Sequence, residues 1–128
     1  MEWTENYNLH IEHIDFQHKE LARIISELQM SVLADDSIEE IDQSVKFLID
    51  YTKFHFLEEE KFMKVQYPRY EEHKQYHQKL LMDISDVIKN IEDGKSINGS
   101  DFIDFITNWL MNHILSQDRK IGEFVAGN

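Results

Sequence analysis

The sequence predicts an all-α protein, an antiparallel up-down-up-down four-helix bundle with an N-terminal arm. Three observations predict it. The 128 residues include one proline and four glycines, apolar residues recur at three- and four-residue spacing in four segments, and the connections between these segments are short. The length is that of a single domain with one core. We therefore expect residues 1–128 to form one domain.

The first two helices are expected over residues 17–34 and 38–66, after an arm formed by residues 1–16. The first has an apolar stripe that stops before Asp35 and consists of Leu21, Ile24, Ile25, Leu28 and Val32. Ser37 and Glu40 have the spacing of a capping box at the start of the second helix. Its stripe consists of Ile41, Val45, Leu48, Thr52 and Phe62.

The last two helices are expected over residues 68–93 and 100–117. Pro68 suits the first turn of a helix, and Gly94 follows the end of the third. The stripe of the third helix consists of Leu80, Ile84, Ile88 and Ile91. Asn98 begins a capping sequence before the fourth helix, whose apolar face includes Phe102, Ile106 and Trp109. Residues 118–128 are expected to form a loose tail. Other large apolar side chains are interpreted as plain core: Phe47, Phe62, Met63, Phe102 and Phe105.

Histidines occupy the apolar face of every predicted helix. The buried stripes contain His18 in the first helix, His55 and Glu59 in the second, His73 and His77 in the third, and His113 in the fourth. Burying these groups without partners would cost several kcal/mol. Counting residues from each loop, with a rise of ~1.5 Å per residue, places all of them in one layer. Because the chain has no cysteine, the layer predicts a metal site with nitrogen and oxygen ligands.

Asp118 and several other polar residues do not continue an apolar stripe so clearly. Asp118 follows His113 by five residues, which is about 140° around an ideal helix, so it shares that face only if the helix ends or is distorted there. His10 and His13 are interpreted as arm residues outside the site. For Asp15 a helix N-cap is favoured over a hydrogen bond to a ligand, and of Glu58 to Glu60 only Glu59 is expected to point inward.

Charge and hydropathy exclude several partners. The net charge of −12 disfavours nucleic acid and anionic lipid, which are bound mainly through lysine and arginine. The longest stretch without Asp, Glu, Lys or Arg, residues 105–117, is shorter than the ~20 residues that span a bilayer, so membrane insertion is not expected. The first residues lack the pattern of an export signal, so a cytoplasmic location is expected.

Four motifs carry a resemblance to a known family. They are Ile14-Asp15-Phe16-Gln17-His18, then His55-Phe56-Leu57-Glu58-Glu59, then Met63 with Tyr67-Pro68 and His73-x-x-x-His77, and finally Trp109-Leu110-Met111-Asn112-His113-Ile114 followed by Asp118. With these motifs the sequence resembles the hemerythrin family, in particular its single-domain bacterial members, over nearly the whole chain. His10 departs from the pattern, because relatives are expected to carry a small residue there, often glycine.

The resemblance implies a cofactor of two iron ions with an oxo or hydroxo bridge. His73, His77 and His113 would hold one iron, His18 and His55 the other, and Glu59 and Asp118 would bridge them. Dioxygen would bind to the iron held by two histidines. The dry pocket that reversible binding requires would be formed by Leu21, Phe56, Trp109, Leu110 and Ile114.

The function expected on this basis is reversible dioxygen binding, for carriage, storage or delivery, and not an enzymatic activity. Dioxygen is the expected ligand, and an unidentified protein that receives the oxygen is a further partner considered. Two alternatives stay open: a di-iron oxidase, peroxidase or nitric-oxide-handling enzyme, and an oxygen-sensing module that acts through a partner. The ligand set disfavours the enzyme, since di-iron oxygenase bundles typically use four carboxylates and this chain offers two.

Overall fold

The computed structural model describes residues 3–34, 38–94 and 99–127. The described residues form five α-helices and no strand, so the prediction of an all-α bundle is confirmed. A 3-10 turn lies in the arm at Glu5–Tyr7, and a π-helical turn at Ile114–Asp118 joins the last two helices. The helices are α1 (Glu12–Leu33), α2 (Ile38–Gln66), α3 (Tyr70–Glu92), α4 (Gly99–His113) and α5 (Arg119–Gly127).

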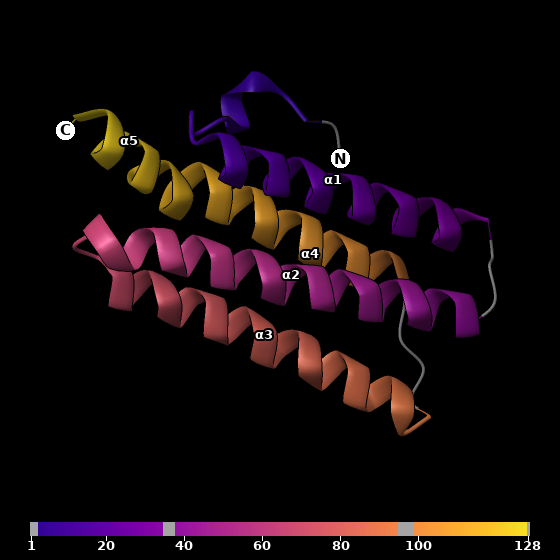
Figure 1. Cartoon of the computed structure of the whole chain (residues 1–128). Helices are drawn as coiled ribbons and strands as arrows, with labels where there is room; N and C mark the ends of the chain where they lie inside the picture. Colours follow the sequence, from indigo (N-terminus) through magenta and orange to yellow (C-terminus); the bar gives the residue numbers. More distant parts are fainter. Residues whose placement is uncertain (1–2, 35–37, 95–98, 128) are drawn as a thin grey trace.

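Helices α1 to α4 run alternately up and down, and α5 continues α4 alongside the N-terminal arm (Figure 1). Helix α1 packs against α2 and α4, and α2 packs against α3. None of the helices among the described residues is long and apolar enough to cross a membrane. The bundle thus surrounds one central space, into which all four long helices direct side chains.

Two apolar clusters fill this space on either side of a polar layer. The larger one, here called the main core, contains aliphatic side chains from all four helices, including Leu28, Val45, Leu48, Ile84 and Ile103. The smaller one, the arm core, joins the arm to the end of α2 and to α5 through Leu9, Ile11, Ile14, Met63, Tyr67 and Ile121. The polar layer between them is the site described below.

The arm is fixed to the bundle by polar contacts and close packing. The backbone N–H of Leu9 donates to Asp15 Oδ1 at 2.8 Å, and the Arg119 guanidinium donates to the carbonyl of Asn6 at 2.6 Å. A Cβ atom at position 122 would lie 2.9 Å from the Leu9 carbonyl oxygen, so this close approach requires Gly122. The arm therefore lies directly on the start of α5.

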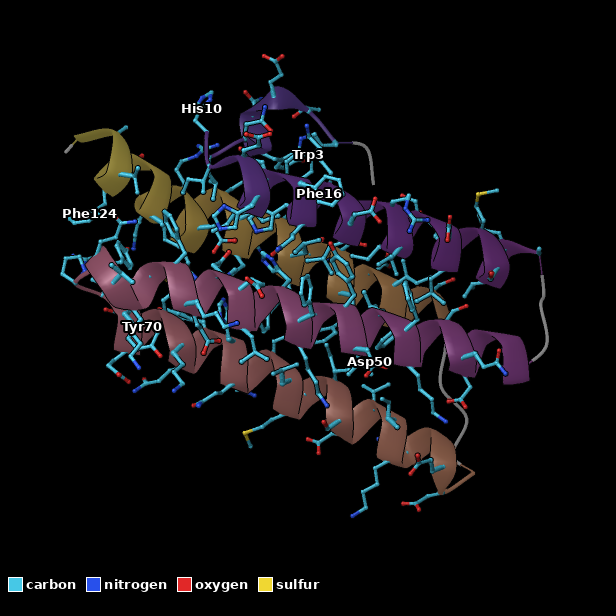
Figure 2. The ribbon with its side chains drawn as sticks, viewed as in Figure 1. Trp3, His10, Phe16, Asp50, Tyr70 and Phe124 are labelled. Carbon is cyan, nitrogen blue, oxygen red and sulfur yellow. The ribbon has the colours of Figure 1, made fainter. Side chains whose placement is uncertain are left out.

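His10 is the one non-glycine residue with a positive φ among the described residues, at 63°. Its side chain is exposed and points outward from the arm (Figure 2). Glycine adopts this left-handed conformation at least cost. The backbone thus accounts for the glycine expected at this position in relatives.

Several boundaries differ from the sequence-based predictions. Helix α1 begins at Glu12 and not at residue 17, and its N-cap position is Ile11, whereas Asp15 lies within the first turn and accepts from Leu9. The third helix begins at Tyr70. The segment predicted as a loose tail is helical from Arg119 because Ile121 is fully buried in the arm core.

Two of the side chains assigned to the core are exposed. The exposed fraction is 54% for Phe47 and 36% for Phe105, whereas Met63 and Phe102 are buried as expected. The stripe period was right, but Phe105 lies at the edge of its stripe and Phe47 lies outside its stripe. The caps predicted at Ser37 and Asn98 lie outside the described residues.

Candidate metal centre

Seven ionisable side chains form the polar layer, and all seven are buried. They come from α1, α2, α3, α4 and the π-helical turn, and they are His18, His55, Glu59, His73, His77, His113 and Asp118. Their ligand atoms fall into two groups that share Glu59 and Asp118, and within each group all ligand atoms lie within 4.8 Å of one another. The structure therefore brings together all seven residues predicted as metal ligands.

Asp118 reaches the layer because the helix is distorted and does not end. The π-helical turn spans Ile114–Asp118 between α4 and α5, and its hydrogen bonds span five residues where those of an α-helix span four. Residues five apart, such as His113 and Asp118, therefore face the same side. Their nearest ligand atoms, His113 Nε2 and Asp118 Oδ1, are 3.0 Å apart.

Three histidines form the first group, here called the three-histidine subsite. His73 Nε2 lies 2.9 Å from Glu59 Oε1 and 3.0 Å from Asp118 Oδ1. His77 Nε2 lies 3.1 Å from Glu59 Oε1. The Nε2 atoms of His113 and His73 are themselves 3.0 Å apart. Five ligand atoms thus converge on one point.

Two histidines form the second group, the two-histidine subsite. His18 Nε2 lies 3.0 Å from Asp118 Oδ2 and 3.4 Å from Glu59 Oε2. His55 Nε2 lies 3.2 Å from Glu59 Oε2. Each carboxylate therefore directs one oxygen to each subsite, and the two-histidine subsite has one protein ligand fewer than the other.

The hydrogen bonds of two histidines indicate that the layer needs a cation between its ligand atoms. Nδ1 of His55 faces the amide oxygen of Gln17 at 2.7 Å, and Nδ1 of His77 faces a carboxylate oxygen of Glu60 at 2.9 Å. Both oxygens only accept, so each Nδ1 donates and each Nε2 presents a lone pair to Glu59. A lone pair opposite a carboxylate oxygen is repulsive unless a metal ion or a second proton lies between them.

Unsatisfied atoms and ligand spacing support the same reading. Both ring nitrogens of His18, Oε2 of Glu59 and both carboxylate oxygens of Asp118 are buried and have no hydrogen-bond partner among the described residues, which is costly unless an ion binds them. Ligands that meet one ion at ~2.1 Å lie ~3.0 Å apart at right angles and ~3.4 Å apart in a tetrahedron. The separations of 2.9 to 3.4 Å in the two subsites fall in this range.

Without an ion, protons would have to compensate the carboxylates. Burial would lower the pKa of His18 and His73, but Asp118 and Glu59 outweigh it and raise each pKa to about 9. At His55 burial dominates and lowers the pKa. Burial would raise the pKa of both carboxyl groups, but the facing histidines hold each pKa below its ordinary value. Both carboxylates are therefore ionised at neutral pH.

A small apolar cavity adjoins the layer on the side of the main core. Its volume is about 20 Å³, and it is lined by Leu21, Ile25, Leu48, Thr52, Phe56, Leu80, Ile84, Ile106, Trp109 and Leu110. Four of the five residues predicted to form the ligand pocket thus line it. The fifth, Ile114, is fully buried but is not part of the lining.

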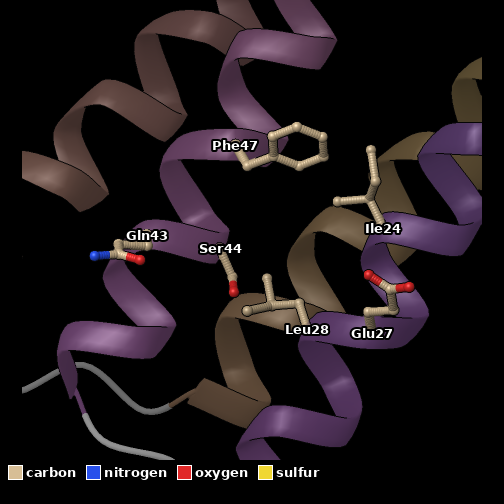
Figure 3. Close-up of a pocket in the computed structure, with 6 residues that line it drawn as sticks. All are labelled: Ile24, Glu27, Leu28, Gln43, Ser44 and Phe47. Carbon is tan, nitrogen blue, oxygen red and sulfur yellow. The ribbon is translucent and has the colours of Figure 1, made fainter.

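A wider hollow lies elsewhere, on the surface between α1 and α2 (Figure 3). This groove of about 360 Å³ is lined by Ile24, Glu27, Leu28, Gln43, Ser44 and Phe47, none of which belongs to the polar layer. His10 and His13 are exposed and also lie outside the layer, as expected.

Two residues that contact the site were missed by the sequence reasoning. Glu60 was expected in solvent, but it hydrogen-bonds to His77, and Gln17 hydrogen-bonds to His55. Glu60 follows the ligand Glu59 by one residue, and Gln17 precedes the ligand His18 by one residue. Neither therefore lies on the helix face of its neighbouring ligand. The available signal was chemical: a histidine that binds a metal through Nε2 needs an acceptor for its Nδ1–H.

Comparison with known proteins gives a consistent result. A family model described as the hemerythrin HHE cation binding domain matches residues 9–125. A bacteriohemerythrin of Methylococcus capsulatus is 32% identical over 124 residues, which cover 95% of this chain and 94% of the relative. A myohemerythrin of Theromyzon tessulatum is 29% identical over 120 residues, 93% of this chain and 88% of the relative. The crystal structure of a wild-type hemerythrin superposes with a TM-score of 0.90 at 31% identity and covers 97% of this chain and 96% of its own.

The cation-binding description of the matched family agrees with a buried layer of histidines and carboxylates that could hold metal. It also agrees with the prediction of a binding protein rather than an enzyme. The match extends over most of the sequence, from Leu9 to Val125, and includes the whole polar layer. The resemblance inferred from the motifs is confirmed, and the chain belongs to the hemerythrin family.

Proposed function

We propose that this protein binds dioxygen reversibly at a centre of two iron ions, as an oxygen carrier, store or supplier. The observation that carries the proposal is the small apolar cavity beside a layer of seven side chains that could hold metal ions. A volume of about 20 Å³ accommodates a molecule on the scale of one water. Such a space suits a small apolar gas and is too small for an organic substrate.

His73, His77 and His113 would hold one iron, and His18 and His55 the other. The proposal for Glu59 and Asp118 is that each binds both ions, which is supported by the way their two oxygens divide between the subsites. Two ferrous ions bound there would supply the electrons that reversible dioxygen binding requires. The ion at the two-histidine subsite, with one protein ligand fewer, would be the one open to dioxygen.

The cavity lies within one helical turn of the layer on all four helices. Leu21 follows His18 by three residues, and Leu110 precedes His113 by three. In α2 and α3 the same relation holds for Thr52 before His55 and for Leu80 after His77. Three residues correspond to a rise of ~4.5 Å, so a molecule in the cavity would adjoin the ligands.

Reversible binding requires that no nearby acid protonates the bound gas. No lining residue of the cavity is acidic, basic or a histidine. The single hydroxyl group, that of Thr52, already donates to the carbonyl of Leu48 at 2.7 Å. The lining therefore excludes water and offers no ready proton donor.

The experiment is to load the protein anaerobically with ferrous iron, measure iron per chain, and cycle it between dioxygen and argon while recording its absorption spectrum. We expect two irons per chain and an absorption band that appears with dioxygen and disappears under argon over repeated cycles. A band that persists under argon would contradict reversible carriage. Rapid multiple turnover with peroxide or nitric oxide would favour the enzymatic alternative.

A matched pair of histidine variants tests the site. His55→Ala removes a ligand of the two-histidine subsite, and we expect it to lose the oxygen-dependent band. His13→Ala removes an exposed histidine outside the polar layer, whose ring packs edge-on against Phe62, and its spectrum should match that of the wild type. Equal behaviour of both variants would contradict the proposed ligand set.

A further inference from the structure

The outward-facing nitrogens of the site histidines have unequal partners. On the three-histidine side, His77 Nδ1 donates to the carboxylate of Glu60 at 2.9 Å. On the two-histidine side, His55 Nδ1 donates to the neutral amide oxygen of Gln17 at 2.7 Å, and the Nδ1 of His18 is buried without a hydrogen-bond partner among the described residues. Among the described residues, a charged acceptor therefore hydrogen-bonds to a histidine of the three-histidine subsite and not to one of the two-histidine subsite.

The surroundings keep this difference in charge effective. His77 is 1% exposed and Glu60 15%, and Gln17 and His55 are both buried. Interactions between groups this far from water are poorly screened. A carboxylate that accepts from Nδ1–H raises the electron density at Nε2 and so makes the imidazole a stronger ligand. The resulting gain in the strength of the metal–nitrogen bond is greater for an ion of higher charge.

We propose that Glu60 and Gln17 are positioning residues that make the two subsites electronically unequal. Glu60 favours the ferric over the ferrous state at the three-histidine subsite through His77. Gln17 fixes His55 in the same tautomer without adding that bias, so the ion at the two-histidine subsite is the harder one to oxidise. This inference rests on the proposed function in one respect, the presence of two iron ions.

The structure offers variants that keep the hydrogen bonds and move only the charge. Glu60→Gln removes the carboxylate behind His77, and Gln17→Glu places one behind His55. The double variant carries both changes and keeps the net charge of the chain. Glu58→Gln is the matched control, because Glu58 carries the same charge on the same helix but faces Lys61 at 3.7 Å on the surface.

The experiment is a redox titration of the iron-loaded wild type and the four variants, preceded by a measurement of iron per chain. For Glu60→Gln we expect the preference for the ferric state at one ion to fall about tenfold, which raises one midpoint potential by about 59 mV for a one-electron couple. Gln17→Glu should lower the other midpoint by a similar amount. The double variant should show both shifts. For Glu58→Gln the preference for the ferric state should change less than about threefold at either ion.

The outcomes separate this inference from the proposed function. Two irons per chain, with shifts for Glu60→Gln no larger than for Glu58→Gln, would overturn the inference and leave the di-iron centre standing. Shifts of the same sign for Glu60→Gln and Gln17→Glu would also overturn it, because a merely structural role predicts no opposite effect. Fewer than two irons in the wild type would overturn both.

Discussion

The two halves of the bundle differ in what fills them. The half that contains the main core is filled by apolar side chains. Leu28, Leu48 and Ile84, for example, are almost fully buried there. In the half that contains the α2–α3 turn, the helices enclose five histidines and two carboxylates, with the arm core beyond them. The same helices build both halves.

This difference indicates that the two halves are stabilised in different ways. Burial of aliphatic side chains stabilises the main core whether or not an ion is bound. The polar layer contains buried atoms without hydrogen bonds, which destabilise the folded protein unless a cation compensates them. We therefore expect stability to depend on the ion in the site half and to be independent of it in the main core.

Removal of the iron should have the largest effect. A ligand that binds only the folded state stabilises it by about 4 kcal/mol at a concentration a thousandfold above its Kd. Iron-free protein should accordingly lose several kcal/mol of the free energy of unfolding, measured by chemical denaturation. Hydrogen exchange should increase mainly in α5 and the π-helical turn, and a uniform increase over all helices would contradict the division into two halves.

A rise in pH should lower the stability of the ion-free form but not that of the loaded form. The pKa of His18 and of His73 in the ion-free fold is raised from 6.5 to about 9. The stability that these groups contribute is therefore fully present below pH 6.5 and is lost as the pH rises through about 9. In the loaded protein the same protons compete with the metal, so a rising pH strengthens binding. Above about pH 7.5 the unfolded chain carries almost no protons on these histidines, so the gain in metal binding offsets the loss in the ion-free fold. Between pH 7 and 9.5 the free energy of unfolding should therefore fall for the ion-free form and stay nearly constant for the loaded form.

Leu48→Ala tests the half that should not depend on the ion. The side chain is 1% exposed, so its truncation should lower the free energy of unfolding by about 3 kcal/mol. The loss should be the same with and without iron. Phe47→Ala is the control, since its ring is 54% exposed and should contribute less than about 1 kcal/mol. A loss for Leu48→Ala that depends strongly on iron would show that the halves are coupled.

His10→Gly should have the smallest effect, and a favourable one. The variant relieves a left-handed backbone conformation at φ 63°, and we expect a gain of about 0.5–1 kcal/mol in the free energy of unfolding. His13→Gly provides the contrast, because His13 lies in the first turn of α1 and glycine there should not stabilise. A loss of stability in His10→Gly would mean that the imidazole itself holds the arm in place.

The fold and most of the site were accessible from the sequence because both follow from helical periodicity. Histidines that continue an apolar stripe must face the core, and counting from the loops places them at one level. Asp118 could not be derived in this way, since its position depends on a local change in helical twist. The contacts of Glu60 and Gln17 with the site were not predicted, because each residue is next to a ligand in the sequence and lies outside the buried stripe.

The arm and the end of the chain were predicted less well for a related reason. Residues 12–16 and 119–127 are helical in the structure, but their apolar side chains meet one another only after the bundle has formed. The hydrogen bond from Arg119 to the carbonyl of Asn6 joins residues 113 positions apart. No local pattern encodes a contact of that range.

The π-helical turn has a consequence for transferring this site to another scaffold. Helices α4 and α5 are one helix with a single residue too many, and that excess residue turns Asp118 toward the layer. Copying the seven side chains onto ideal helices would leave the carboxylate pointing elsewhere. A designed bundle would have to include the irregular turn, and a motif search restricted to spacings of three and four residues would overlook half of the carboxylate pair.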